Sequence, residues 1–262
     1  MTELQAIILG IVEGITEFLP ISSTAHIILV SKFLQIPSNE FIKFFDVFIQ
    51  SAAILAIIIS YFKYIFQNKK LIFMILISFF ITAFIIIPFY KIIKSVFFES
   101  ISLIIFNTII IGVLILLVEY VIGKGKLKNY KSLEKLNYKE AILIGIFQSL
   151  SMMPGISRAG IVILAMLLLK YKREDSAIYS FLLSVPTIIS AGIFDLYKTS
   201  IQDFSIILNN IQPLIWGCLF SFFSALIVVK FFIEYLKTHT FKIFGWYRIF
   251  LGIILILVFG LK

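Results

Sequence analysis

Six long apolar segments constrain this chain more than any other feature of its sequence. Each approaches the roughly 20 residues that an α-helix needs to cross a hydrocarbon core of about 30 Å. We expect these crossing helices at residues 41–62, 71–90, 101–122, 175–197, 213–236 and 243–260. Of the 262 residues, 61% are hydrophobic and 14% are charged, whereas soluble domains are about 45–50% apolar and about 25% charged. The sequence therefore predicts an all-α integral membrane protein.

Two shorter apolar segments lie on either side of a polar break near the N-terminus. Residues 4–19 are too short to cross the membrane as a helix. Pro20 lacks a backbone donor and ends this helix, and residues 25–36 continue as a second short helix. This pattern is typical of a re-entrant hairpin, which enters and leaves on the same side. Its non-helical backbone must be buried in protein or line a cavity.

The second half of the sequence repeats the first half. Residues 5–14 align with residues 140–149, and residues 20–25 align with residues 154–159. Each half is therefore predicted to contain one re-entrant hairpin followed by three crossing helices. Because three is an odd number, the second repeat must have inverted topology relative to the first, as in many transporters.

We expect both repeats to lie in a single membrane domain. Repeat 1 covers residues 1–123, a lysine-rich loop covers 124–139, and repeat 2 covers 140–262. The loop is placed in the cytoplasm because short cytoplasmic loops are enriched in lysine and arginine. Both termini are then extracytoplasmic. The two hairpins enter from opposite sides, so their tips can meet near the midplane of the membrane.

The formal net charge of +9 would suggest nucleic-acid binding in a soluble protein. Here the lysines cluster in short loops between apolar segments, so we attribute the charge to membrane topology and to contact with anionic lipids. No nucleic-acid partner is expected. The single cysteine, Cys218, excludes an internal disulfide and a cysteine metal cluster.

Two carboxylates precede the first break. Glu13 and Glu17 are four residues apart, so on a helix they share one face with Cβ atoms about 5–6 Å apart. Two like charges on one face are unfavourable, and ionisable groups inside a membrane indicate a functional site by default. We therefore expect a cation or a proton to be shared between these two carboxylates.

The two hairpin tips together supply the candidate site. Its members are Glu13, Glu17, Ser22, Ser23, Thr24, His26, Gln148, Gly155, Ser157 and Arg158. Arginine presents a fixed fork of donors that matches phosphate or carboxylate, and paired carboxylates can hold a divalent cation. Restarting helices offer free N–H groups to an anion. Hydroxyls and an imidazole can act as nucleophile or acid–base. The set suits an anionic phosphate headgroup whose lipid tail lies between helices.

Structural roles compete with several of these assignments. Ser22, Ser23 and Ser157 stand at helix starts, where N-capping is a serious alternative. His26 can also be a buried imidazole with satisfied hydrogen bonds. The two glutamates and Arg158 can form an ion cluster that binds no ligand, although such burial is costly.

Four further polar residues receive weaker predictions. Asp46 and Gln50 lie one turn apart in the first long helix, and structural and site-lining roles stay equally open for them. Arg248 lies near the predicted cytoplasmic end of the last crossing, where a headgroup anchor is expected. His239 lies in a loop and is expected to face solvent.

Two motifs carry a family resemblance. Residues 13–26 read Glu-Gly-Ile-Thr-Glu-Phe-Leu-Pro-Ile-Ser-Ser-Thr-Ala-His, and residues 154–160 read Pro-Gly-Ile-Ser-Arg-Ala-Gly. The chain closely resembles the undecaprenyl-diphosphatase family of bacterial inner-membrane enzymes, also called bacitracin-resistance proteins. The resemblance covers essentially the whole chain. Ala25 and Ala159 stand where the family usually has glycine and serine.

The resemblance implies hydrolysis of undecaprenyl diphosphate to undecaprenyl phosphate, which recycles the lipid carrier of cell-wall synthesis. It implies a divalent cation, Mg²⁺ or Ca²⁺, with Glu13 and Glu17 as metal ligands or acid–base groups and Arg158 as the phosphate clamp. Ser23 is favoured as the nucleophile, assisted by His26, while direct attack by water fits the residues equally well. The expected substrate-binding residues are Ser22, Thr24, Gln148, Gly155, Ser157 and Arg158.

The expected partners are a polyprenyl diphosphate and membrane lipids, with a homodimer as a further possibility. A transporter or flippase for a polyprenyl phosphate is the main alternative, because inverted repeats with broken helices are typical of transporters. Release of inorganic phosphate in detergent, where transport is impossible, separates the two functions. A phosphatidic-acid type of phosphatase is disfavoured because it needs two neighbouring histidines, and this chain has only His26 and His239.

Overall fold

The computed structural model describes residues 1–37, 39–96, 100–128 and 130–260, with residues 89–96 described by their backbone alone. Its helices, in chain order, are α1 (Glu3–Thr16), α2 (Ser23–Phe33), α3 (Glu40–Gln67), α4 (Lys69–Val96), α5 (Ile101–Gly123), α6 (Tyr138–Ser149), α7 (Arg158–Leu168), α8 (Arg173–Asp203), α9 (Ser205–Leu208), α10 (Ile211–Leu236) and α11 (Lys242–Phe259). Two 3₁₀ turns, η1 (Leu133–Lys135) and η2 (Leu150–Met152), complete the set. Over the described residues there is no β-strand, so the all-α prediction is confirmed.

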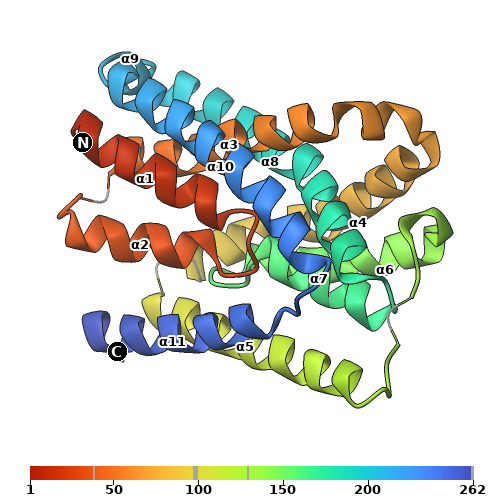
Figure 1. Cartoon of the computed structure of the whole chain (residues 1–262). Helices are drawn as coiled ribbons and strands as arrows, with labels where there is room; N and C mark the ends of the chain where they lie inside the picture. The colour runs from red at the N-terminus through yellow and green to blue at the C-terminus, as the bar shows by residue number, and fades with distance from the viewer. Residues whose placement is uncertain (38, 97–99, 129, 261–262) are drawn as a thin grey trace.

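Six of these helices are long and apolar enough to cross a membrane: α3, α4, α5, α8, α10 and α11. They correspond one to one to the six crossings predicted from the sequence. In Figure 1 the two termini lie at the same end of the molecule, and the connection between α5 and α6 lies at the opposite end. The chain is therefore built as a multi-pass membrane protein.

The second crossing helix extends beyond the end expected at residue 90. Helix α4 continues through Pro88 to Val96, and helix α8 likewise contains Pro186. Proline is tolerated inside crossing helices because neighbouring groups can satisfy the carbonyl that it leaves free. Residues 91–96, between the expected second and third crossings, therefore continue α4, and residues 97–99 lie outside the described part of the chain.

The break at Pro20 is present, with shifted boundaries. Helix α1 ends at Thr16, three residues earlier than expected, and α2 begins at Ser23. The start of α1 is fixed by Thr2 and Gln5, whose side chains and backbone N–H groups bond reciprocally in a capping box. A second pair of short helices, α6 and α7, is interrupted in the same way by η2 and the residues that follow.

The two short-helix pairs pack on corresponding partners. Helix α1 lies against α10, and α6 lies against α4, while α3 contacts α8 and α5 contacts α11. Glycines allow the close approach: a Cβ at Gly10 would lie 2.3 Å from the carbonyl oxygen of Gly217, and one at Gly145 would lie 2.5 Å from that of Ser78. Small residues at such interfaces are the usual means of packing helices in membranes.

We predict that Gly10→Ala destabilises the protein. Its new methyl group meets the α10 backbone, which cannot move aside as a flexible side chain can, and overpacking of this kind costs about 1–3 kcal/mol. Thermal unfolding in detergent measures the effect. Gly123→Ala is the matched control, because nothing lies within 4 Å of its Cβ, and it should unfold no lower than the original chain. Equal unfolding temperatures for both variants would contradict the close α1–α10 packing.

Candidate active site

The first tip, defined as residues 17–22, ends in an uncommon backbone conformation. Ser22 has φ 71° and ψ 89°, in the left-handed region, and its hydroxyl accepts a hydrogen bond from the N–H of Ala25 at 3.4 Å. A non-glycine residue held there stores about 1–3 kcal/mol of strain, and such residues cluster at functional sites. The N-capping interpretation is thus confirmed for Ser22, and this cap places Ser23 as the first residue of α2.

The second tip, defined as residues 150–157, ends in a similar cap. The hydroxyl of Ser157 accepts a hydrogen bond from the N–H of Gly160 at 3.1 Å, which makes Ser157 the N-cap of α7. Gly155 has φ +87°, and a Cβ there would lie 2.5 Å from the carbonyl oxygen of Ile104 in α5. Glycine is therefore required at this position both by the backbone conformation and by the approach to α5.

The carboxylate of Glu17 joins the two tips. Ser23 Oγ donates a hydrogen bond to Glu17 Oε2 at 2.6 Å, and Arg158 Nη1 donates to Glu17 Oε1 at 3.3 Å. The Glu17 side chain is 7% exposed and that of Arg158 is 22% exposed. Charge-assisted hydrogen bonds of this kind are about twice as strong as neutral ones. The structure therefore brings three of the predicted catalytic residues into direct contact.

A cavity of about 60 Å³ opens beside this contact. It is lined by Glu17, Ser22, Ser23, Thr24, Gln50, Ser151, Ile156, Ser157 and Arg158. The first residues of α2 and α7 both belong to this lining, so two helix N-termini adjoin one small space and favour an anion there. Gln50, whose role the sequence left open, lines the cavity. Ser151 was missed, although it aligns with Thr16 in the repeat.

Glu13 lies one turn before Glu17 and is buried. Its charged neighbours are Glu17, Asp46 and Arg158. One carboxylate oxygen of Glu13 and one of Asp46 are buried without a hydrogen-bond partner among the described residues. A buried carboxylate oxygen without a partner is costly, so a cation or a proton belongs beside it.

Glu13 and Glu17 could hold a divalent cation only together with other ligands. No group of three histidine, cysteine or acidic side chains in the described ranges is arranged to hold a metal alone. Glu13 and Glu17 supply two carboxylates, and magnesium usually takes one or two carboxylates together with substrate phosphate oxygens and water. The free Glu13 oxygen is the atom on which this assignment rests.

His26 makes no hydrogen bond to Ser23 in the described structure. Its Nδ1 lies 2.7 Å from the carbonyl oxygen of Ser22, and its Nε2 lies 2.7 Å from the hydroxyl of Tyr247. Because the carbonyl can only accept, Nδ1 carries the proton and Nε2 accepts from Tyr247. The two rings are parallel within 3°. Both nitrogens are thus engaged, and Tyr247 is a partner that only the fold reveals.

Gln148 does not line the cavity. Its Nε2 donates to the hydroxyls of Thr82 at 3.0 Å and Thr187 at 3.4 Å, so it joins α6 to α4 and α8. Its carbonyl oxygen is buried without a partner in the described structure. Gln148 aligns with Glu13 in the repeat. The side chain of Gln148 is surrounded by hydroxyl groups, whereas that of Glu13 lies near carboxylates.

The prediction that Arg248 is a headgroup anchor is wrong. Its side chain is fully buried, and its guanidinium donates to backbone carbonyls of Pro20, Asn107, Thr108 and Gly155. Its place near a helix end suggested the membrane surface, but the packing of α11 on α5 turns this residue inward. His239 is exposed, as the sequence predicted.

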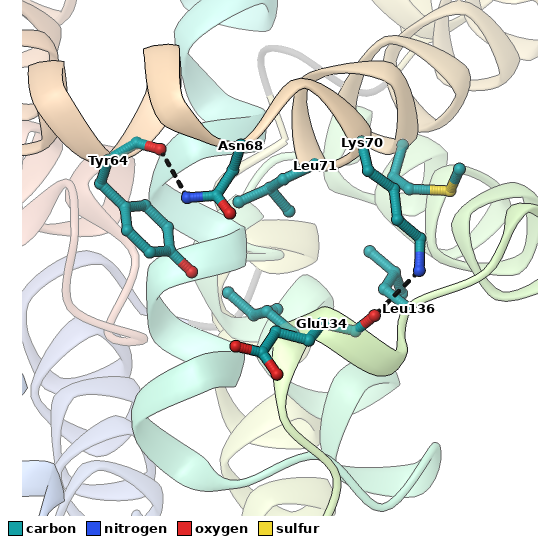
Figure 2. A pocket seen from close by; sticks show the side chains of 8 residues that line it. Tyr64, Asn68, Lys70, Leu71, Glu134 and Leu136 are labelled. Carbon is teal, nitrogen blue, oxygen red and sulfur yellow. Dashed lines mark hydrogen bonds between the residues drawn. The ribbon is translucent and has the colours of Figure 1, made fainter.

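A larger cavity, of about 140 Å³, lies between the α3–α4 turn and η1 (Figure 2). Lys70 Nζ donates to the carbonyl oxygen of Glu134 at 2.9 Å, and Asn68 bonds to the carbonyl oxygen of Tyr64. None of the predicted site residues lines it. The predicted site residues therefore line the smaller of these two cavities.

Comparisons with known proteins agree with this geometry. Residues 6–254 match the family model described as bacitracin resistance protein BacA. Relatives named undecaprenyl-diphosphatase include one from Sulfurihydrogenibium sp. (strain YO3AOP1), 44% identical over 97% of this chain and 98% of the relative. Another, from Aquifex aeolicus (strain VF5), is 38% identical over 97% of each chain. A third, from Methanococcus aeolicus, is 37% identical over 99% of each chain. The resemblance read from the two tip motifs is confirmed, and the chain belongs to the BacA family of bacitracin resistance proteins.

Proposed function

We propose that this chain hydrolyses undecaprenyl diphosphate to undecaprenyl phosphate and inorganic phosphate, and so recycles the lipid carrier of cell-wall synthesis. The relatives are named for this activity. The observation that carries the proposal is the contact of Ser23 and Arg158 with the same Glu17 carboxylate beside a polar cavity. Nucleophile, proton acceptor and phosphate clamp thus lie within one small site.

The contacts favour Glu17 over His26 as the group that takes the Ser23 proton. Ser23 Oγ attacks the terminal phosphorus while its proton passes to Glu17 Oε2, with which it already shares a hydrogen bond. The bond to the bridging oxygen breaks, and undecaprenyl phosphate leaves. Glu17 returns this proton to the departing phosphate. Water then attacks the phosphoserine and passes a proton through Glu17 to the departing Ser23 Oγ, which releases inorganic phosphate and the free serine. In the alternative, water attacks directly and Glu17 takes the proton of that water.

The remaining groups of the site stabilise negative charge. Arg158 and the N–H groups at the starts of α2 and α7 adjoin the cavity and can bind the phosphate oxygens. We assign Glu13 and Glu17 to a divalent cation, Mg²⁺ or Ca²⁺, which when bound would neutralise charge on the diphosphate. Ser22 and Ser157 hold the two helix starts in place as caps.

We also propose that the fold consists of two inverted repeats, each with a re-entrant helix pair. The matching contacts of α1 with α10 and of α6 with α4 support this arrangement. In Figure 1 the first short pair starts at the end that holds the termini, and the second starts at the opposite end. We further propose that the protein lies in a bacterial inner membrane with both termini outside the cytoplasm, because short cytoplasmic loops are enriched in lysine and arginine.

The direct test is phosphate release from a polyprenyl diphosphate by the purified protein in detergent. We expect release that depends on enzyme concentration. Well-folded protein that releases no phosphate with any divalent cation would favour the transporter alternative, for which the repeat arrangement is the supporting observation.

We predict that Ser23→Ala and Glu17→Gln each lower kcat by about 10²-fold or more, because each removes a group that acts in the transition state. Matched controls lie on the same helices. Ser31→Ala removes a hydroxyl of α2 that has no hydrogen-bond partner among the described residues, and Glu3→Gln removes an exposed carboxylate of α1. Both controls should keep near-normal turnover. Substantial turnover by Ser23→Ala would instead assign the attack to water.

We predict that EDTA abolishes phosphate release and that added Mg²⁺ or Ca²⁺ restores it. Binding of Mn²⁺, followed by electron paramagnetic resonance, should weaken at least tenfold in Glu13→Gln, since that variant loses one of two carboxylate ligands. Glu3→Gln again serves as the control. Unchanged Mn²⁺ binding in Glu13→Gln would remove this residue from the cation site.

The proposed topology predicts opposite labelling of two engineered cysteines in a Cys218→Ser background. In intact bacteria whose outer membrane has been permeabilised, a membrane-impermeant maleimide should label Glu3→Cys. It should label Lys126→Cys only after the inner membrane is opened. The reverse pattern would invert the proposed orientation, and labelling of both sites would contradict an intact barrier between them.

A further inference from the structure

Arg248 is a buried cation whose hydrogen bonds all go to backbone. It lies in α11 and is 0% exposed. Its guanidinium makes four hydrogen bonds, and each acceptor is a backbone carbonyl. A buried charge is tolerated only when its donors are satisfied. The set of acceptors therefore shows which parts of the fold this residue holds together.

The four acceptors come from three separate segments. Nε donates to Thr108 at 3.0 Å and Nη2 to Asn107 at 3.3 Å, both in α5. Nη1 donates to Pro20 at 3.3 Å, in the first tip. Nη2 also donates to Gly155 at 2.7 Å, in the second tip. One planar group thus bonds to both tips and to the helix beside them.

The packing around Arg248 brings α11 close to α5 and the second tip close to Asn107. A Cβ at Gly112 of α5 would lie 3.0 Å from Cβ of Arg248 and 2.9 Å from the carbonyl oxygen of Gly245, so glycine allows α11 to approach closely. The second tip has an additional tie, because Asn107 Nδ2 donates to the carbonyl oxygen of Pro154 at 2.7 Å. The first tip has no equivalent bond from α5 among those of the described residues.

Arg248 is not among the residues that line the small cavity, so it does not meet the substrate there. The groups that line this cavity come from the two tips and the helix starts that follow them: Glu17 and Ser23 at the first tip, and Arg158 at the second. Their spacing depends on how the two tips sit relative to each other. A link that bonds to both tips at once controls that spacing.

We propose that Arg248 is a positioning residue that fixes the two tips in register, so that Ser23, Glu17 and Arg158 face one cavity. The expected effect on kcat rests on the proposed function, whereas the relative position of the two tips is a property of the fold. Lysine cannot replace arginine here, because one ammonium has three donors on a single atom and lacks the planar fork.

The kinetic test compares Arg248→Lys with Arg173→Lys. Arg173 is a matched control because its guanidinium also makes a forked contact between helices, to both oxygens of the buried Glu119, at a distance from the tips. We expect Arg248→Lys to lower kcat by about 10²-fold, as small misplacements of reacting groups do, with KM changed by less than about threefold. Arg173→Lys should keep its kcat. Unchanged kcat in Arg248→Lys, or a KM raised tenfold or more, would overturn the positioning role.

The structural test is hydrogen–deuterium exchange of the same variants, which does not depend on activity. Peptides covering 17–24 and 150–160 should both exchange faster in Arg248→Lys and remain unchanged in Arg173→Lys. Faster exchange in only one of the two peptides, or in neither, would overturn the proposal. If the original chain releases no phosphate, the proposed function fails. The exchange result would still show whether Arg248 holds the two tips in position.

A second variant keeps the proposal testable if Arg248→Lys does not fold. Asn107→Ala removes the side-chain bond to Pro154 and leaves the Arg248 bonds to backbone in place. Exchange should rise in 150–160 and stay normal in 17–24, because Arg248 still holds the first tip. Equal loosening of both peptides by Asn107→Ala would show that Arg248 does not hold the first tip independently.

Discussion

The two helix breaks inside an apolar bundle place the strongest physical demand on this fold. Where a helix stops within a membrane, backbone N–H and C=O groups lose their partners, and no water is at hand to replace them. The carbonyls of Pro20 and Gly155 bond to Arg248, that of Pro154 bonds to Asn107, and both restarting helices are capped by serines. One buried charge, that of Arg248, therefore serves the backbone of both breaks.

The same breaks create the chemistry of the site. A helix that restarts inside the protein directs its N–H groups and the positive end of its dipole into the interior. Here two such starts adjoin one small cavity, which suits an anion such as a phosphate. Glu17 lies between them and holds the Ser23 hydroxyl and Arg158 together before any substrate arrives. This preorganisation reduces the rearrangement needed during the reaction.

The two halves of the chain are similar in sequence but differ in chemistry. Glu13 in the first half has a free buried carboxylate oxygen, whereas the aligned Gln148 donates to Thr82 and Thr187. The second half instead contributes Arg158 to the shared cavity. The fold therefore brings Glu17 of one half against Arg158 of the other, a contact that neither half could form alone.

The sequence by itself determined the helical class, the six crossing helices, the two breaks and most residues around them, because hydropathy and proline are local signals. Only the tertiary structure decided that Arg248 turns inward, that His26 bonds to Tyr247, and that Glu17 is the partner of Ser23. The rotation of each helix about its axis is set by packing against segments far away in the chain. No local pattern encodes that rotation, so partners across helices could not be read from the sequence.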